Sequence, residues 1–299
     1  MTLENKLQTL VFSIKNKRSS LDEESKRLRT PDEKIKFNKN NHDSWCRAAT
    51  GDALVKLRLF TEQNFNFIET MGVISITRYT FELSIWLRLF DIDSRYGLVY
   101  ASQLIETQRR YWLDQKVQLQ REIFLLKSLS IDESELIKGE EEKLNLMSNT
   151  QKAQAAAATL YERVTKTIDN KAARKFSIYA DQAKDNGYEP LAAFIERKLL
   201  PDVENSISEI EKEQLEFTSK LSQDVRNLIP NRWNWRNMAQ TVGMVDEYDY
   251  IYTFTSKLLH ATPASLTTNQ KNLELHEIII FLKFVDIKFL DAIEIAKRY

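Results

Sequence analysis

The stretch that decides the fold class is Val73–Phe90, Val-Ile-Ser-Ile-Thr-Arg-Tyr-Thr-Phe-Glu-Leu-Ser-Ile-Trp-Leu-Arg-Leu-Phe. It is apolar on nearly every side of a helix, and such a helix lies inside a protein rather than on its surface. Arg78 and Glu82 stand within it, four residues apart. Because a cation that precedes its acidic partner adds little to an isolated helix, we expect both side chains to serve tertiary contacts. A structural salt bridge and a functional pair remain equally open.

The same helical periodicity runs through most of the chain. Six Gly and five Pro among 299 residues are few turn-formers, which favours long helices and short connections. Thr30 and Ser130 each open a capping-box pattern and so predict two helix starts. No segment alternates apolar and polar residues as a strand does. The predicted fold class is all-α, a multi-helix bundle with long antiparallel helices and a helical hairpin arm.

Charge and composition divide the chain into a charged N-terminal segment and a main domain. Residues 1–44 are expected to form a charged N-terminal helical segment and linker, and residues 45–299 the main all-helical domain. Within that domain, roughly 133–228 is expected as a helical-hairpin insertion. Residues 203–228 place apolar side chains near a 3.5-residue spacing, the pattern of a coiled-coil-like arm packed on a neighbour. Pro201 predicts that the preceding short helix ends there.

Charge balance argues against one class of partner. Lys plus Arg and Asp plus Glu number 43 each, so the formal net charge is zero. This balance predicts no overall positive field on the protein that would attract nucleic acid. A local contact remains open at Arg109 and Arg110, which precede Tyr111 and Trp112 and offer phosphate contact and stacking. A charged helix flank beside a buried aromatic ring is the commoner meaning of such a cluster.

The single cysteine and the apolar runs indicate the compartment. Cys46 excludes an intrachain disulfide and a cysteine-based zinc site, and it suits the reducing cytoplasm. His42 lies four residues before it, but a small buried thiol is far commoner than a nucleophile. The most apolar run, Ile278–Leu290, is interrupted by charges and reads as a core helix. We expect no signal peptide and no membrane contact.

The chemistry-bearing stretch is Tyr248–Pro263. If it is helical, Tyr248, Tyr252, Ser256 and His260 recur every four residues on one face, and Pro263 stops the helix. His260 would then lie near a helix C-terminus, where the dipole raises its affinity for a proton.

We therefore take Arg78, Glu82, Tyr252, Ser256 and His260 as candidate catalytic residues. His260 would act as general acid or base, and Arg78 would stabilise a developing phosphate charge. The alternative is a hydrogen-bonded core network in which these side chains satisfy one another. No glycine-rich phosphate loop, nucleophile elbow or zinc-binding helix motif occurs, so we expect no cofactor and no metal.

These residues also carry a resemblance. The block Arg-Tyr-Thr-Phe-Glu-Leu at 78–83 resembles an uncharacterised family of bacterial helical proteins, the 5677 family of domains of unknown function. So does Trp-x-x-Arg-x-Met-Ala at 233–239, followed by Gly243 and by the Tyr-Tyr-Ser-His-Pro spacing at 248–263. The likeness covers about residues 45–290. Relatives often carry Arg after the second Tyr, where this chain has Thr253.

That family is similar in style to the HEPN group of helical domains, many of which are metal-independent ribonucleases in toxin and antiphage systems. Their usual signature places Arg shortly before His. No His in this chain has an Arg at that distance upstream, so Arg78 would have to come from another helix.

The function expected from these observations is that of a soluble cytoplasmic helical protein. It would be a subunit or effector of a bacterial defence or toxin-like system, acting through protein or nucleic-acid contacts. A protein partner or homo-oligomer is expected, and RNA or DNA stays open. One alternative is a HEPN-like metal-independent ribonuclease with His260 as acid/base. Another is a structural adaptor whose 203–228 arm binds a partner helix.

Overall fold

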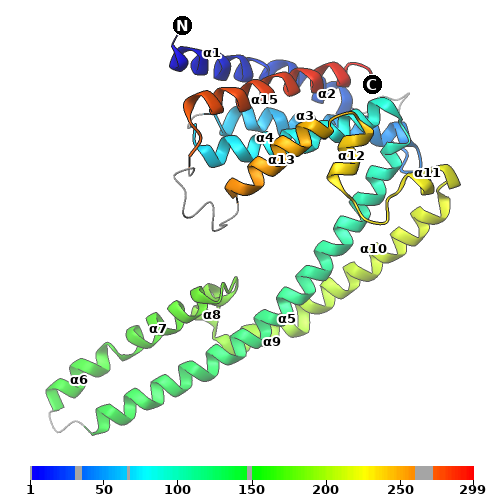
Figure 1. Cartoon of the computed structure of the whole chain (residues 1–299). Helices are drawn as coiled ribbons and strands as arrows, with labels where there is room; N and C mark the ends of the chain where they lie inside the picture. The colour runs from blue at the N-terminus through cyan, green and yellow to red at the C-terminus, as the bar shows by residue number, and fades with distance from the viewer. Residues whose placement is uncertain (1, 31–35, 66–67, 147–149, 260–271) are drawn as a thin grey trace. The chain divides into compact units, whose positions relative to one another are not determined.

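The computed structural model describes residues 2–30, 36–65, 68–146, 150–259 and 272–299 (Figure 1). Within these ranges all regular secondary structure is helical and no strand occurs. Several helices are long, the longest being α5 at Tyr96–Asn145. The prediction of an all-α, multi-helix architecture is confirmed.

The chain divides into two compact units. The first comprises Met1–Gln103 and Ser219–Tyr299, and the second Leu104–Thr218. The first unit contains α1 (Leu3–Asn16), α2 (Arg18–Arg29), α3 (His42–Gln63), α4 (Thr70–Ile92), the start of α5, α11 (Gln223–Leu228), α12 (Trp235–Thr241), α13 (Val245–Leu259) and α15 (Leu275–Ala296). The second holds the rest of α5 and the helices α6 to α10. The second unit therefore begins earlier than the hairpin that the sequence predicts at roughly 133–228.

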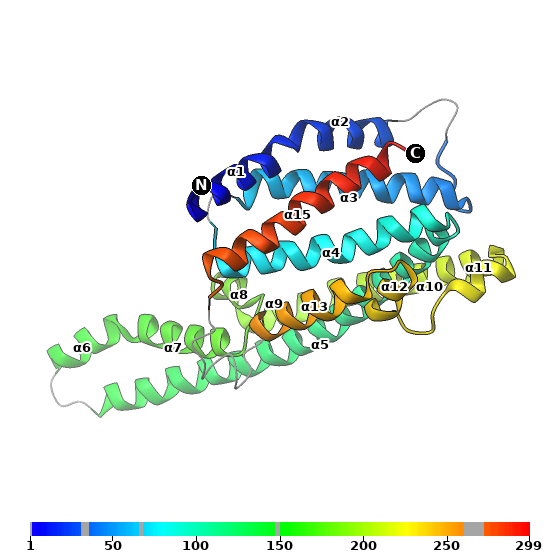
Figure 2. The ribbon, with the colours of Figure 1, turned by 45° about the horizontal axis from the view of Figure 1, so that its top comes forward.

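The core of the first unit forms around α4. Phe81, Ile85 and Leu89 of α4 are fully buried, as is Phe289 of α15. α4 packs against α15, α13, α12 and α3, and α15 also packs against α1 (Figure 2). The buried hydroxyls of Ser84 and Thr77 are satisfied within the helix, since Ser84 Oγ donates to the Thr80 carbonyl at 2.7 Å and Thr77 Oγ1 donates to the Val73 carbonyl at 2.8 Å. Thr80 Oγ1 is buried without a hydrogen-bond partner among the described residues. The expectation that Val73–Phe90 forms a core helix is confirmed.

The N-terminal helices belong to the same core. Ile14 of α1 and Leu21 and Leu28 of α2 are buried. Leu21 and Leu28 are seven residues apart, so they share one face of α2, and α2 packs closely on α3. The charged run at 18–29 is therefore a packed helix with a solvated outer face, and residues 2–30 are not a linker.

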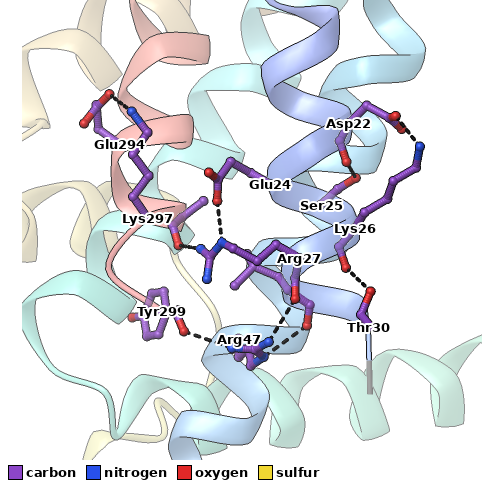
Figure 3. Close-up of polar contacts among 12 residues, drawn as sticks. Asp22, Glu24, Ser25, Lys26, Arg27, Thr30, Arg47, Glu294, Lys297 and Tyr299 are labelled. Atoms are coloured by element: carbon purple, nitrogen blue, oxygen red, sulfur yellow. Dashed lines mark hydrogen bonds and ion pairs between the residues drawn. The ribbon is translucent and has the colours of Figure 1, made fainter. Parts of the chain in front are cut away.

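Two arginines satisfy the ends of these helices (Figure 3). Arg47 of α3 donates hydrogen bonds to the carbonyls of Arg27, Leu28 and Tyr299 at 2.9, 3.1 and 2.9 Å. Arg27 donates to the Ala296 carbonyl at 2.6 Å. The last carbonyls of a helix lack partners within it, and the negative end of the helix dipole favours cations. Arg47 and Arg27 therefore tie the C-terminal ends of α2 and α15 to α3.

A close contact fixes the start of α5 against α3. A Cβ added at Gly97 would lie 2.2 Å from the His42 carbonyl oxygen and 2.9 Å from Cys46 Sγ, so only glycine fits. Cys46 is fully buried, and its thiol donates to the Ser94 carbonyl at 3.3 Å. Burial raises the pKa of this thiol to about 12. Cys46 is thus the small buried thiol that the sequence favoured over a nucleophile.

The second unit is built along α5. It contains α6 (Thr150–Ala158), α7 (Leu160–Arg174), α8 (Ala180–Asn186), α9 (Tyr188–Phe194), the π-helical turn η1 (Ile195–Leu199) and α10 (Leu200–Lys220). Ion pairs set the antiparallel register of α5 and α10: Lys116 with Glu204 at 2.8 Å and Arg109 with Glu211 at 3.1 Å.

α7 returns along the other end of α5 (Figure 1). Arg163 of α7 pairs with Glu140 of α5 at 3.1 Å, and Lys171 pairs with Asp132. The fully buried Glu122 accepts hydrogen bonds from Ser177 Oγ at 2.6 Å and from Gln118 Nε2 at 3.0 Å. The predicted helical hairpin is therefore present, with α5 as its outgoing helix.

Two predicted helix boundaries are wrong. α5 runs unbroken through Ser130, because Leu126 and Leu129 continue its buried stripe and tertiary packing overrides the local cap. Pro201 lies in the first turn of α10, directly after η1, where a missing N–H is tolerated. Thr30 ends α2: its backbone N–H donates to the Lys26 carbonyl at 2.8 Å. The helix start that the capping pattern predicts after Thr30 stays a prediction, because residues 31–35 lie outside the described residues.

Candidate functional site

The packing of α13 on α4 brings two of the candidate residues together. Cζ of Arg78 lies 4.3 Å from the centroid of the Tyr252 ring. Arg78 Nε also donates to Glu82 Oε1 at 3.2 Å. Both charged side chains are half-buried. The helix that carries Arg78 therefore packs directly against the helix that carries Tyr252.

The four-residue spacing in α13 places its tyrosines on one face. The rings of Tyr248 and Tyr252 stack with centroids 4.8 Å apart and planes 16° apart. Tyr248 also contacts Phe81 of α4, with centroids 6.2 Å apart. Burial raises the pKa of Tyr248, and the neighbouring Tyr252 raises it further. The aromatic pair thus forms part of the contact between α13 and the core.

Of the remaining candidates, only Ser256 lies on this face within the described residues. Ser256 is half-buried, one turn beyond Tyr252, and makes no hydrogen bond to the part of the chain that the structure describes. His260 lies outside the described residues, so its acid–base role stays a prediction. The structure therefore brings Arg78, Glu82 and Tyr252 together, with Ser256 on the adjacent turn.

The geometry limits what Arg78 offers to a ligand. Glu82 compensates its charge, and Tyr252 covers one side of its guanidinium. Such a contact stabilises the packing of two helices, and an additional phosphate would have to compete with Glu82. The arrangement favours the core-network alternative for these three residues.

The basic cluster in α5 is compensated in the same way. Arg109 pairs with Glu211 of α10 at 3.1 Å, and Arg110 pairs with Glu106 at 2.7 Å. Trp112 packs against the core of the second unit, and Tyr111 contacts its ring edge-on at 5.1 Å. The cluster therefore has the commoner meaning, a charged helix flank beside an inward aromatic ring.

An aromatic cluster in the first unit was missed in the sequence. Trp86 of α4 stacks on Trp233 at 4.2 Å with an interplanar angle of 13°, and it meets Tyr100 edge-on at 5.2 Å. Phe90 contacts both Trp86 and Tyr100 at 5.8 Å. The available signal was Trp86 in the Val73–Phe90 stretch and Trp233 at the start of the 233–239 segment, although their contact depends on tertiary packing. Trp86, Phe90 and Tyr100 of this cluster line a cavity.

An apolar stripe on α5 was missed as well. Val117, Phe124 and Ile131 are 64, 77 and 60 % exposed, and each is seven residues from the next. They therefore lie on one face of the helix. The seven-residue spacing was visible in the sequence, but which face of α5 its neighbours would leave uncovered was not.

Neither a group of metal-ligating side chains nor a membrane-spanning helix occurs in the described ranges. No group of three or more His, Cys, Asp or Glu side chains is placed to hold a metal ion there. None of the helices in those ranges is both long enough and apolar enough to cross a membrane.

Comparison with protein-family models, curated proteins and solved structures finds no match to this chain.

Proposed function

We propose that this chain is a helical adaptor that binds a partner protein through the outward face of α5. The single observation that carries the proposal is the stripe of Val117, Phe124 and Ile131. We call these three residues the α5 stripe. The partner surface is a helix whose apolar residues recur at the same spacing.

The spacing of the α5 stripe distinguishes it from scattered surface residues. Single exposed apolar side chains are normal on a protein surface. Three at successive seven-residue intervals occupy one of the two apolar positions of a coiled-coil seam, in which each apolar side chain enters a hole on a facing helix. Covering a side chain such as Phe124 contributes about 1.5–3 kcal/mol.

The rest of α5 holds the stripe in place. Leu119, Leu126 and Leu129 are buried in the core of the second unit. Val203 of α10 lies in the same core. The 203–228 segment thus uses Val203 inside its own chain, and the adaptor surface belongs to α5.

The biological setting is part of the proposal. We place the adaptor in the cytoplasm, where the buried Cys46 thiol stays reduced. Its role as a subunit or effector of a bacterial defence or toxin-like system rests on the resemblance of the 78–83 and 233–263 segments. The partner is a second protein or a second copy of this chain.

One observation keeps a second function open, a metal-independent ribonuclease with His260 as acid/base. Arg78 of α4 contacts the face of α13 on which the four-residue periodicity places His260. A ribonuclease of this kind would need Arg78 to exchange Glu82 for phosphate during the reaction.

Photo-crosslinking in the source cells tests the adaptor function. A photoreactive phenylalanine analogue replaces Phe124 in one variant and Leu215, which is exposed on α10, in a matched control. We expect a discrete crosslinked partner from position 124 and none from position 215. The triple change of the α5 stripe to glutamine should abolish partner binding, because losing a buried aromatic anchor costs about 2 kcal/mol or more.

Two measurements complete this test. Light scattering of the purified chain shows whether the partner is a second copy, since the triple variant would then have half the mass of the wild type. Circular dichroism checks that the triple variant keeps its helical content. Equal crosslinking from both positions, or a triple variant that still binds the partner, would exclude the α5 stripe as the adaptor surface.

A further inference from the structure

A cavity of about 310 Å³ lies in the first unit, lined by residues of α2, α3, α4 and the start of α5. Trp86, Phe90, Tyr79 and Tyr100 supply aromatic surface to its wall. Its size is at the lower end of the range for small-molecule sites, which are mostly apolar with a few convergent polar groups.

Packing holds the aromatic wall in position. Tyr100 meets Trp86 and Phe90 nearly at right angles, at 88° and 83°. The indole of Trp86 is backed by Trp233, stacked at 4.2 Å. A wall whose rings are fixed before binding loses little side-chain entropy when a ligand enters.

The cavity also presents two phenol hydroxyls. Tyr79 and Tyr100 both line it, and neither makes a hydrogen bond to the part of the chain that the structure describes. Burial raises the pKa of both, so each keeps its proton at neutral pH. Each O–H can therefore donate to, or accept from, a heteroatom on a flat ring.

A second cavity, of about 440 Å³, shares Arg29 and Val55 with the first. Lys26 and Arg58 join Arg29 in its lining, and both pair with the carboxylate of Asp22, at 2.6 and 3.0 Å, so three cations face one carboxylate. Arg58 Nε is buried without a hydrogen-bond partner among the described residues.

Cations also outnumber carboxylates at the aromatic cavity. Lys56 and Arg29 line it together with Asp52, which pairs with Arg29 at 3.3 Å. Lys56 has no ion pair within the described ranges. The surroundings of both cavities therefore favour a ligand with negative charge.

We infer that these two neighbouring cavities bind a nucleotide unit, with its base against Trp86 and Tyr100 and its phosphate among Arg29, Lys56 and Arg58. Bases stack on aromatic side chains, and arginine and lysine bind phosphate oxygens by charge-assisted hydrogen bonds. A cationic ligand would suit the aromatic wall but would be repelled by Arg29 and Lys56. A purely apolar ligand would leave both phenols without partners.

Titration calorimetry on the full chain tests this site with AMP, GMP, CMP and UMP, and with adenosine and ribose 5-phosphate as the two halves of AMP. We expect AMP to bind at least about tenfold more tightly than either half, because only AMP fills both cavities. Quenching of tryptophan fluorescence should follow the same order. A six-nucleotide single strand that binds more tightly than AMP, and that is weakened by the same variants, would support the site. It would also show that the nucleotide bound there belongs to a nucleic-acid strand.

The variants remove each recognition element separately. Lys56→Glu and Arg29→Glu change exposed side chains and should weaken AMP binding at least tenfold each. Tyr100→Phe keeps the ring packing and removes one hydroxyl, so we expect a smaller loss of about threefold to tenfold. Lys283→Glu, an exposed cation of α15, is the matched control and should bind like the wild type.

Three results would overturn the inference. One is the absence of binding by every mononucleotide up to about 1 mM. Another is ribose 5-phosphate binding as tightly as AMP, which would exclude the aromatic cavity. The third is equal loss of AMP binding in Lys56→Glu and Lys283→Glu. That result would show that the loss comes from the net charge of the protein and not from this site.

Discussion

The guanidinium of Arg78 lies 4.3 Å from the centre of the Tyr252 ring, and this contact joins α4 to α13 across 174 positions of the chain. Arg78 also bonds Glu82 on its own helix. One arginine thus links a local ion pair to a long-range aromatic contact. The two stretches that looked most informative in the sequence are neighbours in space.

We predict that Arg78→Ala destabilises the first unit by about 1–2 kcal/mol. The loss combines a cation–π contact, worth about 0.5–1 kcal/mol, with a half-buried ion pair of similar size. Urea unfolding measures it. Arg88→Ala is the control, since Arg88 of the same helix is exposed and its nearest acidic partner, Asp291, lies 3.7 Å away. Equal losses in both variants would show that the Tyr252 contact contributes nothing.

Gly97→Ala should destabilise the protein strongly, because the added Cβ would lie 2.2 Å from the His42 carbonyl oxygen. Overpacking of this kind typically costs about 1–3 kcal/mol. Gly72→Ala is the matched control: its Cβ meets nothing within 4 Å, and alanine favours helix over glycine. Thermal unfolding of the pair should show a lower midpoint for Gly97→Ala and an unchanged or higher one for Gly72→Ala. The reverse order would contradict the contact between α3 and α5.

Cys46 should make stability fall at alkaline pH. Burial raises its pKa from 9.0 to about 12, so the folded state holds its proton more tightly than the unfolded state. Its contribution is therefore complete below pH 9 and is lost as the pH rises towards 12. The slope is at most about 1.4 kcal/mol per pH unit.

Urea unfolding between pH 8 and pH 11 measures this effect, with Cys46→Ala as the comparison. The variant should lose less stability over that range than the wild type. A thiol reagent should also modify wild-type Cys46 at pH 8 only as fast as the protein unfolds. Rapid modification of the folded protein would be inconsistent with a buried, protonated thiol.

The ribonuclease alternative makes its own prediction about His260. Under the adaptor proposal, the purified chain does not cleave single-stranded RNA in the presence of a metal chelator. If cleavage is observed, His260→Ala should slow it about a hundredfold or more without lowering the melting temperature, because general acid–base help is worth that much. His276→Ala, at an exposed histidine of α15, is the control.

The sequence by itself determined the features that depend on near neighbours along the chain. The burial of Val73–Phe90 follows from an apolar surface on all sides of one helix. The stacking of Tyr248 on Tyr252 follows from their four-residue spacing, which places both rings on one face. The long helices follow from apolar periodicity and the scarcity of Gly and Pro.

Tertiary structure alone decided the features that depend on distant residues. α5 passes through Ser130 because packing on α7 and α10 outweighs a local cap that is worth about 1 kcal/mol. The face of α5 that carries Phe124 stays uncovered because those helices occupy its other sides. The Trp86 stack on Trp233 joins positions 147 residues apart. A periodic pattern specifies which face of a helix is apolar, but only the folded chain determines what covers that face.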